Sequence, residues 1–81
     1  MELKYDDRAD ALYIRFSHGS FSHTEIVDDH RNIDYAQDGS VIGIEVLYPT
    51  LGVNVSGLPR EASVGRLLEE YGFRVISTAP S

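Results

Sequence analysis

The segment Tyr35–Leu47, with the sequence YAQDGSVIGIEVL, decides the fold of the first half of the chain. Asp38 and Gly39 both tolerate the positive φ of a tight hairpin turn, so this pair predicts a β-hairpin. The strand that follows, Val41–Leu47, is a run of apolar and glycine residues interrupted by a single carboxylate, Glu45. The hairpin therefore predicts a sheet, and it raises the question of what a carboxylate does inside an apolar strand.

Further strand patterns precede this hairpin. In Ala11–Ser17, the apolar residues Leu12, Ile14 and Phe16 alternate with Tyr13 and Arg15, a pattern typical of a sheet with one buried face. The predicted strands are, in order, the segment around Leu3 and Tyr5, Ala11–Ser17, Phe21–Asp28, Asn32–Ala36 and Val41–Leu47. Because every link between them is short, we expect sequential antiparallel neighbours, that is, a β-meander.

The periodicity becomes helical in the last third of the chain. Residues at positions i, i+3, i+4 and i+7 form one apolar helix face, namely Val64, Leu67, Leu68 and Tyr71. Pro59 is typical of a helix start, and Gly72 is well placed to end the helix.

Together these patterns predict one α+β domain over residues 1–81. Residues 1–48 form an antiparallel β-meander of about five strands, and residues 49–81 supply a loop, one C-terminal helix packed on the sheet, and a tail. Leu51–Gly57 is either a short edge strand or an extended linker. Phe73–Ile76 either returns as a last strand or packs against another chain.

Composition limits the function classes. A chain of 81 residues buries only about 60% of its unfolded surface, so its stability benefits from a partner chain. Without cysteine, neither a disulfide nor a thiolate zinc site can stabilise the chain. Association with a second copy is the remaining source of stability, which favours a homo-oligomer. The net charge of −6, with Lys4 as the one lysine, disfavours direct nucleic-acid binding and suits a small basic protein partner. Without a signal-peptide h-region or a long apolar run, we expect a cytoplasmic protein without membrane association.

Glu45 has two interpretations. It faces water on the polar side of the sheet, paired with Arg15, or it lies under a covering element or partner, where a carboxylate needs a cation or hydrogen-bond donors. The second interpretation favours a role of Glu45 in an interface over a role in catalysis.

The other candidate residues do not assemble an active site. Asp6 and Asp10 lie in an acidic cluster whose spacing does not match a calcium loop, and they are expected to cap a turn between strands. Zinc ligands must converge within about 2 Å of the metal, and histidines spread over turns and an extended strand do not. We therefore expect the three histidines, His18, His23 and His30, to be exposed. We therefore predict no metal, no cofactor and no enzymatic activity.

The motifs also resemble those of a known family. Tyr5-Asp6, Ala9–Ile14 (ADALYI), and Asp34-Tyr35 followed by Asp38-Gly39 and Val41–Leu47 are similar to the small prokaryotic family catalogued as domain of unknown function 2283. The resemblance covers roughly residues 1–48. It implies a compact β-meander protein without an established activity. Its association with genes for small toxin-like proteins implies an antitoxin-like or partner-binding role for some members.

The sequence thus favours a non-enzymatic interaction module that acts as a homo-oligomer. Its expected contacts are the helix face, which includes Tyr71, and the segment Tyr48–Val55. The alternative is a small-ligand- or metal-binding protein, with or without hydrolytic activity. Its site would lie at a dimer cleft and contain Glu45, Asp6, Asp10 and a histidine.

Overall fold

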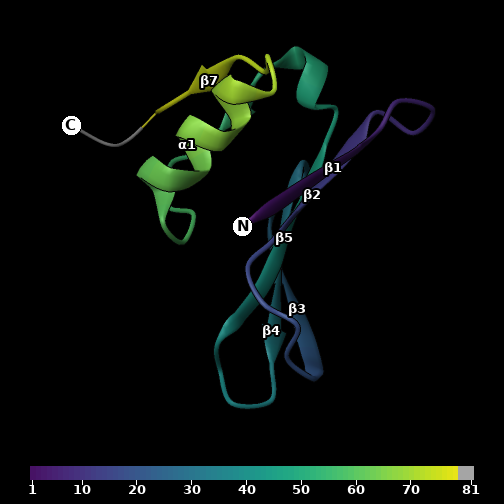
Figure 1. The fold of residues 1–81 in the computed structure, drawn as a ribbon, viewed down its shortest axis with the longest axis vertical. Coiled ribbons are helices and arrows are strands. Elements are labelled where there is room, and N and C mark those ends of the chain that lie inside the picture. The colour runs from purple at the N-terminus through teal and green to yellow at the C-terminus, as the bar shows by residue number, and fades with distance from the viewer. Residues whose placement is uncertain (79–81) are drawn as a thin grey trace. The chain divides into compact units, whose positions relative to one another are not determined.

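The computed structural model describes residues 1–78 (Figure 1). The chain divides into two compact units, residues 1–48 and a second unit that begins at Pro49. Each unit is described below by itself.

The first unit is a five-stranded antiparallel sheet with the strand order β1-β2-β5-β4-β3. Its strands are β1 (Glu2–Asp6), β2 (Ala11–Arg15), β3 (Phe21–Asp28), β4 (Arg31–Ala36) and β5 (Val41–Leu47). The α+β class is confirmed, with an antiparallel sheet followed by one C-terminal helix. Strands β3, β4 and β5 form a meander, and β1 and β2 form a separate hairpin.

One link in the strand order differs from the expected run of sequential neighbours. β2 pairs with β5 and not with β3, in a register that opposes Tyr13 to Glu45. After β2 the chain continues beside β5, where the amides of Phe16 and Ser17 both donate to the Ile42 carbonyl at 2.6 and 3.1 Å. This order places the apolar strand β5 in the centre and leaves β3, most of whose residues are exposed, at the edge.

One face of this sheet is apolar and buried. The residues of this face with the lowest exposed fractions are Leu12, Ile14, Ile33, Ile44 and Val46, none above 3%. A single charged side chain, Arg31, is buried with them at 8% exposure. Its guanidinium forms an ion pair with Asp28 at 2.8 Å and donates a second bond to the same carboxylate at 2.9 Å, which offsets the cost of removing the charge from water.

The second unit holds the helix and two short strands. Its elements are a 3-10 turn (Pro49–Leu51), β6 (Val53–Asn54), α1 (Glu61–Glu70) and β7 (Val75–Ile76). β6 and β7 pair in parallel, so each segment left open by the sequence contributes a short strand. The residues with almost no exposed surface here are Pro49, Val53, Val55, Leu58, Val64 and Leu68.

The start of α1 differs from the prediction. The helix begins at Glu61, and Pro59 lies outside it in the preceding turn. Between them Arg60 adopts a left-handed conformation with φ 50° at the N-cap position. Glu61 bends back and accepts a hydrogen bond from the Gly57 amide at 3.0 Å, which orders this turn without proline at the first helical position.

The end of α1 agrees with the prediction. Gly72 follows the helix with φ 85° and donates to the Glu69 carbonyl at 3.0 Å, and Phe73 donates to the Leu68 carbonyl at the same distance. This paired bonding is a Schellman motif, which requires a left-handed residue that glycine adopts without strain. Among the described residues no helix has the length and apolar character needed to cross a membrane.

Candidate functional site

The open face of the five-stranded sheet carries two rows of mostly polar side chains. Directly opposed residues of antiparallel strands share a face, so the register fixes which side chains are neighbours. One row contains Lys4, Tyr13, Glu45, Asn32 and Ile26, and the next contains Glu2, Arg15, Gly43, Asp34 and Thr24. The alternation of the sequence thus places polar residues from all five strands on one surface.

Tyr13 crosses this face diagonally over Gly43. Its hydroxyl donates a hydrogen bond of 2.8 Å to Oδ2 of Asp34, which lies two strands away. A Cβ at Gly43 would lie 2.5 Å from the tyrosine ring, so the space for the ring exists only because residue 43 is glycine. The glycine in the apolar strand is therefore explained by side-chain packing.

Asp34 also accepts a hydrogen bond from Thr24 at 2.6 Å, so Tyr13, Asp34 and Thr24 connect β2, β4 and β3 across the open face. Burial and the bond to Asp34 raise the pKa of Tyr13 to about 12. At neutral pH the Tyr13 hydroxyl is therefore a fixed hydrogen-bond donor and does not act as a general base.

Glu45 is exposed on this face and accepts a hydrogen bond from Asn32 at 3.1 Å. The expected pairing with Arg15 is wrong, because Arg15 lies opposite Gly43 in the register. The Arg15 guanidinium instead lies over the Tyr13 ring, with Cζ 5.5 Å from the ring centroid.

Asp6 and Asp10 lie at the two ends of the β1–β2 turn. Asp6 accepts backbone hydrogen bonds from Arg8 at 3.0 Å and from Ala9 at 3.4 Å, so its side chain caps the turn. Asp10 has a positive φ of 48° and accepts a hydrogen bond from the Tyr5 hydroxyl at 2.9 Å. That hydrogen bond raises the pKa of Tyr5, because the neutral hydroxyl is the donor. Both carboxylates take part in the structure of the turn.

Tyr48 and Tyr71, the two candidate contact residues, are each more than half exposed, at 51% and 56%. Tyr48 ends the first unit, where its amide donates to the Asp10 carbonyl at 2.7 Å. Tyr71 belongs to the second unit and is the C-cap of α1. Other residues of the predicted helix face are less accessible, since Val64 and Leu68 are fully buried.

The three histidines are exposed and dispersed over different contacts. His18 lies 3.8 Å from Glu2, His23 stacks on Tyr35, and the rings of His30 and Tyr48 form a T-shaped pair. Among residues 1–78, no group of three or more His, Asp or Glu side chains is placed to hold a metal ion.

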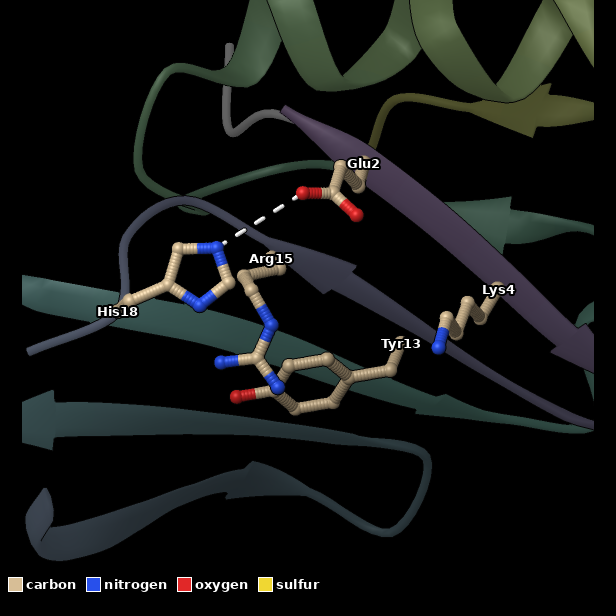
Figure 2. A pocket seen from close by; sticks show the side chains of 5 residues that line it. All are labelled: Glu2, Lys4, Tyr13, Arg15 and His18. Atoms are coloured by element: carbon tan, nitrogen blue, oxygen red, sulfur yellow. Dashed lines mark ion pairs between the residues drawn. The ribbon is translucent and has the colours of Figure 1, made fainter.

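Two depressions flank Tyr13 on the open face. The first, of about 290 Å³, is lined by Glu2, Lys4, Tyr13, Arg15 and His18 (Figure 2). The second, of about 470 Å³, is lined by Lys4, Tyr5, Asp6, Ala9, Ala11, Leu12, Tyr13 and Glu45. The structure thus brings Asp6 and Glu45 to one depression, which no histidine lines. Sequence reasoning did not single out Tyr13, Arg15 or Asp34 as site residues, although alternation put Tyr13 and Arg15 on the polar face.

Comparison with models of protein families shows which family the chain belongs to. The model of the family described as "Protein of unknown function (DUF2283)" matches residues 2–48, more than half of the chain. The chain therefore belongs to this family, and the resemblance inferred from its motifs is confirmed. The match covers the five strands of the sheet. No curated protein and no solved structure matches the chain.

Proposed function

We propose that this member of the DUF2283 family is a non-enzymatic interaction module that self-associates through its edge strand β3. The observation that carries the proposal is the exposure of this strand. β3 is the last strand in the sheet order, so one side of its backbone has no strand neighbour within the described chain. Seven of its eight residues are exposed, and such an edge is a template for pairing with another strand.

Exposed apolar side chains on β3 support an interface there. Ile26 is 77% exposed and Phe21 is 58% exposed, the two largest values among the large hydrophobic residues of the first unit. Neither is explained by the packing of a single chain. Burial of apolar surface is the main favourable term in most protein association, at roughly 25 cal/mol per Å².

The sequence of β3 is complementary to itself. In an antiparallel two-fold pairing centred on Thr24, His23 of one chain lies opposite Glu25 of the second copy, and no like charges are opposed in that pair. Register irregularities lie between Phe21 and His23 and between Ile26 and Asp28, so His23, Thr24 and Glu25 belong to the regular part of the strand. A second copy is therefore the occupant that best fits this edge.

A dimer of this kind carries twice the formal charge of −6 on each chain. Such a surface attracts a basic protein by long-range steering, which supports an antitoxin-like role in binding a small basic partner. Affinity capture from the native host, followed by a salt titration, tests this step. A stoichiometric basic partner that is released by salt supports it, and recovery of the self-associated chain alone contradicts it.

Self-association is tested by light scattering on Ile26→Lys, with Leu51→Lys as the matched control. Both residues are largely exposed, at 77% and 66%, and the substitutions add the same charge. We expect a dimer for the unmodified chain and for Leu51→Lys, and a monomer for Ile26→Lys. A monomeric unmodified chain, or equal dissociation of both variants, contradicts pairing through β3.

The alternative, a small-ligand- or metal-binding site at a dimer cleft, with or without hydrolytic activity, has less support. Asp6 and Asp10 already bond to the β1–β2 turn, and the depression shared by Asp6 and Glu45 lacks a histidine. Elemental analysis of purified protein tests the metal-binding form of this alternative directly, because that form requires a stoichiometric metal.

A further inference from the structure

We propose that the pocket between β1, β2 and the loop after β2 binds a small oxyanion, that is, a phosphate or carboxylate group. Its lining residues are Glu2, Lys4, Tyr13, Arg15 and His18 (Figure 2). All of them belong to the first unit of one chain, so this site does not depend on self-association through β3.

Basic side chains line this pocket, in contrast to the overall negative charge of the protein. The chain has seven Lys and Arg residues and a formal charge of −6, yet two of them, Lys4 and Arg15, line one depression together with His18. They come from β1, β2 and the following loop, and the pairing of Lys4 with Tyr13 and of Glu2 with Arg15 brings these segments side by side. A cluster of this sign attracts anions on an otherwise acidic surface.

Within the part of the chain that the structure describes, neither Lys4 nor Arg15 forms an ion pair with a carboxylate. Within the described chain, the ion pairs are those of His18 with Glu2 and of Arg31 with Asp28. Arg15 donates a hydrogen bond of 3.4 Å to the Ser17 carbonyl and otherwise lies over Tyr13. A guanidinium carries five N–H donors in a planar fork that matches the oxygens of phosphate and carboxylate, so most of its donors remain available to a ligand.

The position of the Arg15 guanidinium is supported by a fixed ring. Tyr13 is held by its bond to Asp34 and by its packing over Gly43, and the guanidinium lies on its face 5.5 Å from the centroid. Stacking of this kind limits the freedom of the arginine before any ligand arrives. Such preorganisation lowers the entropy cost of binding.

Glu2 is the one carboxylate in the pocket, and it faces His18 at 3.8 Å (Figure 2). It opposes a bound anion by like-charge repulsion, so its removal should strengthen binding. The volume of about 290 Å³ lies at the lower limit of ligand pockets and is large enough to accommodate a phosphate or carboxylate group.

The test is an NMR titration of the backbone amides with inorganic phosphate and, separately, with acetate, at ionic strength held constant with sodium chloride. We expect saturable shifts centred on Lys4, Arg15 and His18. Arg15→Gln should weaken binding at least about tenfold, because a charge-assisted hydrogen bond is lost. Lys4→Gln, at an exposed position, should also weaken binding, and Glu2→Gln should strengthen it.

Arg8→Gln is the matched control, since Arg8 is an exposed arginine that lines neither depression. It should leave the affinity unchanged. Stronger binding of phosphate identifies a phosphoryl ligand, and stronger binding of acetate identifies a carboxylate ligand. Absence of saturable shifts with both anions overturns the proposal. Equal weakening by Arg8→Gln and Lys4→Gln also overturns it, because the effect would then be general charge screening.

Discussion

The two faces of the five-stranded sheet are organised by different forces. On the buried face, aliphatic side chains such as Ile14 and Ile44 lie opposite each other and are fully removed from water. On the open face, Tyr13, Asp34 and Thr24 are connected by hydrogen bonds between side chains that lie far apart in the sequence. The buried face is a consequence of alternation along each strand, whereas the open face depends on which strands become neighbours. Stability should therefore respond mainly to the first face, and ligand recognition to the second.

The largest effect is expected on the buried face. Ile44→Ala removes a side chain with no exposed surface and leaves a cavity, which should lower the free energy of unfolding by about 2–5 kcal/mol. Glu45→Ala, at the next residue on the open face, should cost within about 0.5 kcal/mol. Urea denaturation of the two variants measures this contrast, and equal losses would remove the distinction between the faces.

The next largest loss of stability is expected from a substitution at Gly43 on the open face. Gly43→Ala places a Cβ 2.5 Å from the Tyr13 ring, and this overpacking should cost about 1–3 kcal/mol. The same substitution in a Tyr13→Ala background should cost much less, because the ring that it meets is gone. A double-mutant cycle by denaturation measures the coupling. Additive losses would show that the ring does not lie over the glycine.

A smaller loss is expected when the Tyr13 hydroxyl is removed. Tyr13→Phe keeps the ring over Gly43 but leaves Asp34 without this donor, which should cost about 1 kcal/mol. Tyr5→Phe removes a comparable bond to Asp10 at an exposed site, so its effect should be smaller. A larger loss from Tyr5→Phe, measured in the same denaturant series, would contradict the structural role assigned to the Tyr13 bond.

The smallest expected effect concerns the charge on the buried face and depends on pH. The hydrogen bond from Arg31 lowers the pKa of Asp28 below its ordinary value of 3.8. The folded state therefore favours the ionised carboxylate, so its contribution is present above pH 3.8 and is lost as the pH falls through the lower folded pKa. Because Asp28 is exposed, we expect less than about 1 kcal/mol.

The difference between the unmodified chain and Asp28→Asn isolates this contribution from those of the other carboxylates. Their unfolding free energies should converge as the pH is lowered from 7 towards 3. A difference that stays constant over this range would refute the linkage between Asp28 ionisation and stability.

Local patterns predicted the elements that depend on neighbouring residues. Alternation identified the strands, and Gly72 identified the end of α1, because a left-handed helix stop is a local requirement. The β2–β5 pairing was not predicted, because a short link after Arg15 is compatible with more than one neighbour.

The candidate site was harder to predict from the sequence, for the same reason. Tyr13 and Asp34 are 21 residues apart, and only the β2–β5–β4 pairing brings them together. The pairing of Glu45 with Arg15 was a reasonable inference from their shared face, but Asn32 is the nearer neighbour across β4 and β5. Composition and alternation indicate which face is polar, and strand order decides which polar groups meet.

The central claim, self-association through β3, is tested most directly by amide hydrogen exchange in the unmodified chain at two protein concentrations. Amides of β3 that point away from β4 should exchange slowly in the concentrated sample and quickly in the dilute one, because pairing with a second copy protects them. Protection of the outward amide of Thr24 that disappears on dilution is the predicted result, because the amides of neighbouring strand residues point to opposite sides and that of Glu25 faces β4. Fast exchange of these outward amides at every concentration would contradict the claim.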